Sequence, residues 1–226
     1  MRRIPENLLV QMGAALAAED RDEMAIPSYL HRNPAMRWMA WRRVEVLADL
    51  LHRTCAERGG RVGTILDYGC GSGVLLGEAS ARADRVYGVD LVLDAAELLV
   101  QAWDLDRVQL VPASQAAERL PDRAMDVILA AEVLEHVEPV EDALALLRDK
   151  LAEGGRLLVS LPTESRLYRL GRRLAGFHGH YHHANAASID EAIRRFGFRR
   201  TRLIRVPLPG PFAIYWVAAY AWGGAR

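Results

Sequence analysis

The sequence is poor in cysteine and has no long apolar run. Its 226 residues include two cysteines, Cys55 and Cys70. Two thiols offer no disulfide framework and favour a reducing, cytoplasmic setting. No stretch approaches the roughly 18–20 apolar residues of a membrane-spanning helix. Glu6 and Asn7 interrupt the start of the chain before any apolar run forms, so we do not expect a cleavable signal peptide.

The chain also lacks a net charge, since basic and acidic side chains number 29 each. Their distribution is uneven, because residues 160–226 carry 11 arginines and three acids. This basic part would suit an anionic small molecule, a nucleic acid or a membrane surface, or is a solvated face with no specific partner. The absence of overall basicity and of an RNA-binding module argues against nucleic acid, while peripheral contact with a membrane stays open.

Hydrophobic periodicity predicts two N-terminal helices, over residues 5–24 and 35–57, and then a regular alternation of strands and helices. The second helix carries a stripe that we expect to pack against a sheet, formed by Met36, Trp38, Met39 and Trp41. We expect strands at 62–67, 85–90, 107–112, 125–131 and 155–161, with helices at 73–83, 93–103, 115–119 and 140–152 between them. This pattern indicates an α/β fold with a mostly parallel sheet that helices cover on both faces.

The last third of the chain has a different character. A basic, histidine-bearing segment leads to a helix near 188–196 and to strands at 199–206 and 212–222, which should form an antiparallel hairpin at the sheet edge. We therefore expect a single domain over residues 1–226. It would comprise an N-terminal helical cap (1–60), a cofactor-binding half (61–161), and a substrate segment with the edge hairpin (162–226).

The stretch around which the chain is organised is the glycine-rich turn after the first strand, Leu66-Asp67-Tyr68-Gly69-Cys70-Gly71-Ser72-Gly73. Glycines there allow positive φ angles and close approach of a ligand. A dinucleotide fingerprint would have its third glycine one position later, where Val74 stands. Asp67 would repel a pyrophosphate and suits a cationic amino group instead. Asp90 closes the next strand, where a carboxylate can bind a ribose diol.

An amino group, a ribose and no phosphate describe S-adenosylmethionine, and the chain resembles the class I S-adenosylmethionine-dependent methyltransferases. Four motifs in the expected order carry the resemblance: the glycine turn, Gly88-Val89-Asp90, the run from Met125 to Val137, and Gly154-Gly155-Arg156-Leu157-Leu158-Val159-Ser160. It implies a Rossmann-like three-layer α/β/α sandwich with a seven-stranded, mostly parallel sheet whose last strand is antiparallel.

The resemblance also implies which residues bind the cofactor. Asp67 and Gly69 would face the methionine part, with Cys70 in the same turn and with Gly71 and Gly73 allowing close backbone approach. Asp90 would hold the ribose and Leu91 would lie under the adenine. The family's usual acid after the third strand is missing, so we expect Ser114 or a backbone amide to make the adenine contact. Ala131 and Glu132 would line the methionine end.

Histidines and carboxylates beside these motifs leave two readings open. Glu132, Glu135 and His136 would share a helix face and could bind a divalent cation together with a downstream histidine, as in small-RNA 2′-O-methyltransferases and ubiquinone-pathway O-methyltransferases. Without a metal, which we favour, His136 or His180 could act as general base. His182 and His183 are further candidates in the same segment. The remaining alternative is that these histidines are solvent-facing loop residues without a catalytic role.

We therefore expect methyl transfer from S-adenosylmethionine to a small-molecule oxygen or nitrogen, with S-adenosylhomocysteine as product. Arginines in the substrate segment would suit an anionic or lipid-like acceptor (Arg166, Arg169, Arg172 and Arg173). The alternatives are a metal-assisted RNA 2′-O-methyltransferase and a protein of the same fold that binds the cofactor without catalysis. A nicotinamide oxidoreductase ranks below both because of Asp67 and the glycine spacing. The acceptor, the methylated atom and the oligomeric state stay open.

Overall fold

The computed structural model describes residues 1–17, 20, 24–163 and 185–222. Seven strands form one sheet in the order β3-β2-β1-β4-β5-β7-β6. Their bounds are β1 Val62–Tyr68, β2 Ala83–Asp90, β3 Val108–Pro112, β4 Met125–Ala131, β5 Leu151–Pro162, β6 Phe198–Pro207 and β7 Ala213–Trp222. The five strands β1–β5 are parallel neighbours, and β7 runs antiparallel to both β5 and β6. The expected α/β architecture and the edge hairpin are confirmed.

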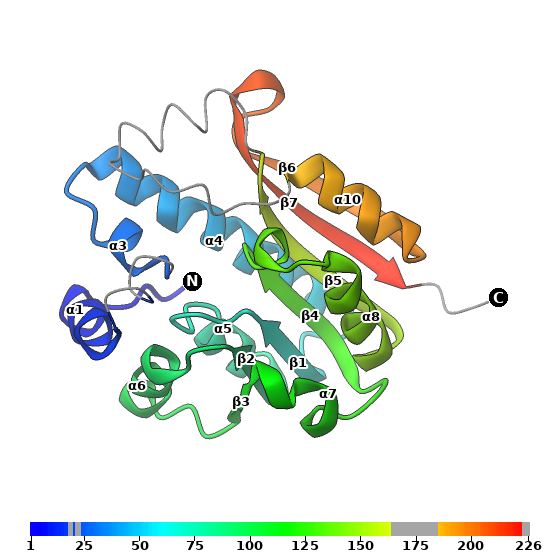
Figure 1. Ribbon diagram of the computed structural model, residues 1–226, viewed down its shortest axis with the longest axis horizontal. Coiled ribbons are helices and arrows are strands. Elements are labelled where there is room, and N and C mark those ends of the chain that lie inside the picture. The colour runs from blue at the N-terminus through cyan, green and yellow to red at the C-terminus, as the bar shows by residue number, and fades with distance from the viewer. Residues whose placement is uncertain (18–19, 21–23, 164–184, 223–226) are drawn as a thin grey trace.

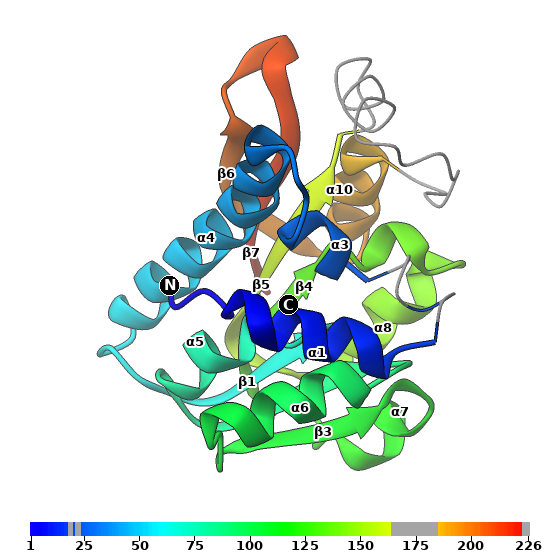
Figure 2. The same cartoon turned by 90° about the vertical axis from the view of Figure 1, so that its left-hand side faces the viewer.

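Helices cover both faces of the sheet (Figures 1 and 2). One apolar cluster joins the sheet to the N-terminal helices and to α5 and α6, and the other joins its opposite face to α7, α8 and α10. The helices are α1 Glu6–Ala15, α3 Ile26–Tyr29, α4 Pro34–Ala56, α5 Leu76–Ser80, α6 Asp94–Trp103, α7 Ala116–Arg119, α8 Val140–Lys150 and α10 Ala186–Arg195. Because both faces are covered, the central strands are near-continuous apolar runs, as parallel strands require.

Three expectations about the helices were wrong in detail. The first helix ends at Ala15 rather than near residue 24, because Leu16 takes an extended backbone and buries its side chain. The helix expected at 73–83 is confined to Leu76–Ser80, since the turn with Gly73 at φ +74° occupies its start. Trp41 is buried as expected, but Trp38 is 49% exposed and does not pack against the sheet.

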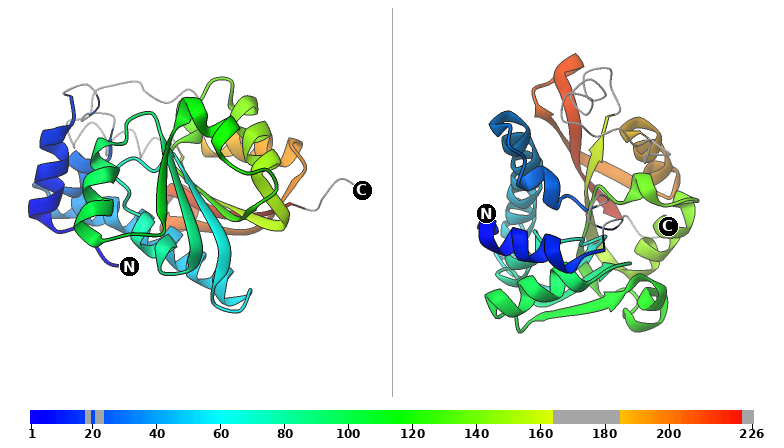
Figure 3. Two further views of the ribbon diagram at one scale, coloured as in Figure 1. Left: turned by 90° about the horizontal axis from the view of Figure 1, so that it is seen from below. Right: turned by 60° about the vertical axis from the view of Figure 1, so that its left-hand side comes forward.

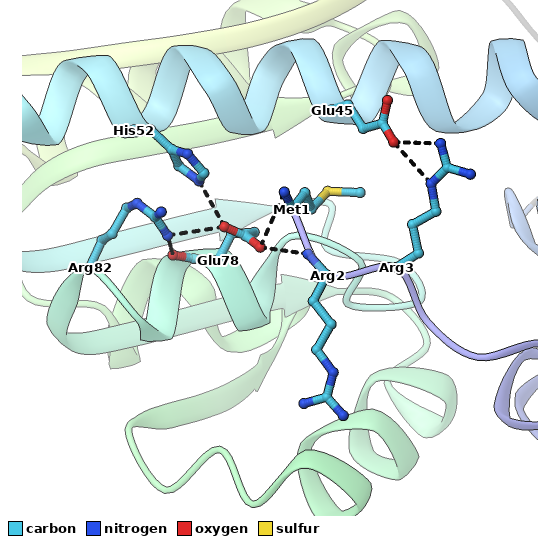
Figure 4. Close-up of polar contacts among 7 residues, drawn as sticks. All are labelled: Met1, Arg2, Arg3, Glu45, His52, Glu78 and Arg82. Carbon is cyan, nitrogen blue, oxygen red and sulfur yellow. Dashed lines mark hydrogen bonds and ion pairs between the residues drawn. The ribbon is translucent and has the colours of Figure 1, made fainter.

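The N-terminal residues tie the cap to the cofactor-binding half through Glu78 on α5 (Figure 4). The Glu78 carboxylate accepts a 2.9 Å hydrogen bond from the backbone N–H of Arg2 and lies 2.7 Å from Nε2 of His52 on α4. Arg82 donates to the same carboxylate at 3.0 Å. Burial raises the pKa of Glu78, but these partners outweigh it and the net pKa is lowered. The ionised carboxylate therefore stabilises this junction.

A second buried polar group fixes α10 to the edge hairpin. Asp190 of α10 is 6% exposed and accepts hydrogen bonds of 2.6 Å from the Tyr220 hydroxyl and from Arg200. Burial and the neighbouring carboxylate raise the pKa of Tyr220, so its hydroxyl keeps its proton and donates. These contacts compensate the cost of burying a carboxylate beneath α10.

No helix in the described part of the chain is long and apolar enough to cross a membrane. Both cysteines are free and buried, as expected for a chain without a disulfide framework.

Candidate active site

The candidate site lies where the strand order reverses. The chain runs from β1 outward to β2 and β3 and then returns to β4 on the other side of β1 (Figure 3). The carboxyl ends of open parallel sheets bind ligands at such a switch point. Asp67, near the end of β1, is level with Gly88 of β2 and with Leu129 of β4. The sequence motifs therefore meet at this edge of the sheet.

The glycine turn is anchored to the neighbouring strand. Backbone N–H groups of Gly69 and Cys70 both donate to the carbonyl of Val89, at 2.8 and 3.0 Å. Gly69 and Gly71 have φ angles of +73° and +51°, a region that side chains rarely adopt. A Cβ added to Gly69 would lie 2.4 Å from Val133, whereas one added to Gly71 would meet open space. The first glycine is needed for packing, and the second leaves room for a ligand.

Asp67 is the most unusual group of the site. It is 1% exposed, and its Oδ1 atom has no hydrogen-bond partner in the described structure. Burial, together with the nearby charge of Asp90, raises the pKa of Asp67 to about 7. A buried carboxylate oxygen without a donor costs free energy, which a cationic or hydrogen-bonding ligand group would recover. The residue thus has the properties that an amino group of a bound cofactor would need.

Asp90 closes β2 and faces the glycine turn. Its Oδ2 accepts the N–H of Gly71 at 2.7 Å, and its Oδ1 accepts the N–H of Leu91 at 2.8 Å. Burial raises the pKa of Asp90, while these backbone donors oppose the rise. The carboxylate is therefore held in one orientation against the turn, as a group that binds a diol must be.

The other predicted cofactor contacts lie at or just after the ends of β2, β3 and β4. Leu91 follows Asp90 and is 86% exposed, so its apolar surface is open to a planar ring. Ser114 is exposed on a 3₁₀ turn, Ala113–Gln115, directly after β3. Ala131 ends β4. Cys70 turns its thiol into the core, where burial raises its pKa, so only its backbone faces the turn.

The expected grouping of Glu132, Glu135 and His136 on one helix face was wrong. Glu132 directly follows β4 with φ +56°, and residues Leu134–His136 form a 3₁₀ turn instead of an α-helix. Glu135 is buried and His136 is exposed. Within the described ranges, no three His, Cys, Asp or Glu side chains are grouped so as to hold a metal ion. His180, His182, His183 and the four arginines of the substrate segment lie outside the described residues.

Sequence reasoning missed a buried ion pair beside Glu132. Nε of Arg43, on α4, lies 2.8 Å from Oε1 of Glu132, and Nη1 of Arg43 donates to the Tyr215 hydroxyl at 2.9 Å. The Ser160 hydroxyl donates to the same Oε1 at 3.3 Å. The signal was present in the sequence, because Arg43 interrupts the buried stripe formed by Ala40, Val44 and Leu47.

A family model described as a methyltransferase domain matches residues 38–203. Curated relatives include the mitochondrial ubiquinone biosynthesis O-methyltransferase of Schizosaccharomyces pombe, 35% identical over 47% of this chain and 40% of the relative. A probable S-adenosylmethionine-dependent methyltransferase of Mycolicibacterium smegmatis is 30% identical over 78% of this chain and 63% of the relative. The chain thus spans between 40% and 63% of the length of these two relatives.

Solved structures share the fold. The N-methyltransferase NodS of Bradyrhizobium japonicum WM9, in complex with S-adenosylhomocysteine, superposes with a TM-score of 0.64. The match covers 95% of this chain and 98% of NodS at 18% identity. At this identity the similarity concerns the fold alone.

Proposed function

This chain belongs to the class I S-adenosylmethionine-dependent methyltransferases, and from that premise we propose that it transfers a methyl group to an oxygen or nitrogen of a small molecule. The observation that carries the proposal is the unpartnered Oδ1 of buried Asp67 beside the glycine turn. The names of the relatives include both O- and N-methyltransferases. They support the reaction class without selecting the acceptor.

The cofactor's groups fit the residues that are present. We propose that Asp67 binds the cationic amino group, that the Gly71 backbone admits the methionine part, and that Asp90 binds the ribose. Leu91 and Ser114 would contact the adenine, and Gly69, Cys70, Gly73 and Ala131 would shape the remainder of the site. When bound, S-adenosylmethionine supplies an electrophilic methyl group on a sulfonium. The protein's main task is then to align the acceptor with that methyl group, and it also excludes water.

A dinucleotide fits these residues less well. Its pyrophosphate would meet the Asp67 carboxylate, whereas an ammonium or sulfonium group would be attracted to it. The glycine turn also leads into α5, which has only five residues, rather than directly into a long helix whose N-terminus could bind phosphate. This contrast supports the methyl donor over a nicotinamide cofactor.

The test is calorimetric titration of the purified protein with S-adenosylhomocysteine and, separately, with NAD⁺. We expect saturable binding of the first and no heat from the second. Binding of NAD⁺ alone would overturn the proposal. A single domain over residues 1–226, a cytoplasmic location, and a site without metal remain predictions. Loss of activity on chelation would overturn the last of these.

A further inference from the structure

The Arg43–Glu132 pair lies at the same sheet edge as the cofactor residues but belongs to different segments. Leu129 is level with Asp67, and Glu132 follows three residues later at the end of β4. Arg43 comes from the N-terminal helix α4 and is 8% exposed. A buried arginine needs a partner, because an isolated charge there would cost several kcal/mol. Glu132 supplies that partner at 2.8 Å.

The two carboxylate oxygens of Glu132 are in different situations. Oε1 forms the 2.8 Å ion pair with Nε of Arg43 and accepts a hydrogen bond from the Ser160 hydroxyl, whereas Oε2 has no hydrogen-bond donor among the residues that the structure describes. The side chain of Glu132 is 20% exposed, twice the 10% of Arg43. The backbone N–H of Glu132 donates to the carbonyl of Ser160 at 2.9 Å, which fixes the residue between β4 and β5. One oxygen is therefore held by the protein and the other is available.

Aromatic side chains lie close to the Arg43–Glu132 pair. The Arg43 guanidinium lies 5.1 Å from the ring centre of Tyr215, and Tyr29 stacks on Trp41 with ring centres 4.5 Å apart. Burial raises the pKa of Tyr29 to about 12. The charge of Glu132 raises it further, whereas Arg43 lowers it by its charge and by a hydrogen bond. This tyrosine is therefore also close to the pair. Burial raises the pKa of Glu132 as well, and Arg43 and Ser160 oppose the rise. The result is a carboxylate oriented by an ion pair close to aromatic side chains.

We propose that Oε2 of Glu132 binds the hydroxyl or amino hydrogen of the methyl acceptor, with Arg43 and Ser160 as the positioning residues that hold Oε1. The inference rests on the proposed function and narrows its acceptor to a molecule whose methylated atom carries an O–H or N–H hydrogen. His136 is the alternative base, but it is exposed on the 3₁₀ turn after Glu132, while Glu132 is held within the fold.

The reaction balances with these groups. A bond forms between the acceptor oxygen or nitrogen and the methyl carbon, and the carbon–sulfur bond breaks with its electron pair remaining on sulfur. The positive charge of the sulfonium is thereby lost, and the acceptor's proton passes to Oε2 of Glu132. No oxidant or further reactant is needed.

The experiment uses the protein saturated with S-adenosylhomocysteine and two pairs of small probes. Phenol and aniline carry the required hydrogen, whereas anisole and N,N-dimethylaniline have the same rings without it. Binding is followed by NMR of ¹³C-labelled glutamate carboxylates. We expect phenol or aniline to shift the Glu132 resonance and its methylated counterpart not to do so.

Variants separate recognition from folding. In protein saturated with S-adenosylhomocysteine, Glu132→Gln should weaken binding of the hydrogen-bearing probe about tenfold or more. Arg43→Met should shift the Glu132 resonance and weaken probe binding, and Arg43→Lys should restore part of it. Glu141→Gln, on the exposed face of α8, is the matched control and should behave as wild type. Melting curves check that each variant is folded.

Equal affinity of wild type and Glu132→Gln for every probe, including no binding to either, would overturn the proposal. Equal shifts of the Glu132 resonance by probes with and without the hydrogen would also overturn it. The wild-type NMR measurement decides the matter even if Glu132→Gln does not fold. Failure of the wild-type protein to bind S-adenosylhomocysteine would instead overturn the proposed function, and this inference with it.

Discussion

The backbone amide of Gly71 donates a 2.7 Å hydrogen bond to the carboxylate of Asp90, which joins the glycine turn to the end of the adjacent strand. The two residues are 19 positions apart in the sequence. Their contact is present without any ligand, so the turn and the proposed ribose-binding group are already in register. A site organised in this way binds its ligand with little ordering cost.

Replacing Asp90 should therefore weaken cofactor binding strongly. We expect Asp90→Ala to lower the affinity for S-adenosylhomocysteine about 10–100-fold, because hydrogen bonds to a charged group contribute about 1.5–3 kcal/mol. Calorimetry measures the change. Asp84→Ala is the control, since Asp84 lies on the same strand with its side chain 73% exposed and pairs with Arg61. Unchanged affinity in Asp90→Ala would contradict the assignment.

Two glycines of the turn should respond differently to alanine. Gly71→Ala places its methyl group in open space, so backbone strain alone should lower the free energy of unfolding, by about 1–2 kcal/mol. Cofactor binding should be lost, because the methyl group would occupy the space proposed for the ligand. Gly69→Ala would bring a Cβ within 2.4 Å of Val133 and should reduce stability by about 1–3 kcal/mol more through overpacking.

Urea denaturation and calorimetry together separate these effects. Gly59→Ala is the reference for strain alone, because Gly59 has φ +91° at the end of α4 and no atom near an added Cβ. Full binding by Gly71→Ala would show that the ligand does not approach this residue.

The raised pKa of Asp67 predicts opposite pH dependences for binding and for stability. The folded protein holds this proton up to about pH 7, whereas the unfolded chain releases it near its ordinary pKa of 3.8. The folded state therefore binds more protons between these values, and Asp67's contribution to stability falls as pH rises through this window. Affinity for a cationic amino group should rise over pH 5.5–7.5, because the ionised carboxylate binds it better.

Asp67→Asn tests both effects. The variant should be more stable than wild type at pH 8, since it removes a buried charge, and it should bind S-adenosylhomocysteine more weakly. Its affinity should also lose most of the change over pH 5.5–7.5. Denaturation at pH 5.5 and 8 and calorimetry over the same range measure these effects. A variant with wild-type affinity and an unchanged pH profile would exclude a role for Asp67 in binding.

The Glu78 junction predicts that its contribution to the free energy of unfolding decreases as pH falls, as is usual for a carboxylate with a lowered pKa. Glu78→Gln should lower the free energy of unfolding at pH 7 by about 1–2 kcal/mol, because the charged acceptor of several hydrogen bonds is lost. The lowered pKa of Glu78 means that this stabilisation is present above the unfolded value of 4.5 and is lost as pH falls through the folded pKa.

The difference between wild type and Glu78→Gln should accordingly shrink below about pH 4.5. Chemical denaturation at pH 7 and pH 4 measures it. A constant difference at both values would show that the charge of Glu78 is not what stabilises the junction.

The sheet and the position of the glycine turn were predictable because their signals are local. The apolar run of β4 was expected at 125–131 and is found at Met125–Ala131. The glycine turn was placed correctly because its positive φ angles leave few alternatives to glycine. Helix ends were less predictable, since the extended backbone at Leu16 follows from tertiary burial and not from the sequence pattern around it.

The contacts of Arg43 were harder to predict because they are long-range. Arg43 and Tyr215 are 172 positions apart, yet their side chains are hydrogen-bonded. Periodicity identified the buried stripe of α4 but gave no reason for an arginine within it. The left-handed backbone at Glu132 likewise separated this residue from Glu135 and His136, which sequence spacing had grouped together.

Because Arg43 belongs to α4, the residues near Glu132 can vary independently of the glycine turn. The groups proposed to bind the cofactor lie between β1 and the end of β4, whereas Arg43 and Tyr29, close to Glu132, come from the preceding helices. With the proposed role of Glu132, substitutions in those helices would alter which molecules are accepted without touching the glycine turn. Exchange of the N-terminal segment between relatives would then be a direct route to hybrid enzymes with a common methyl donor and new substrates.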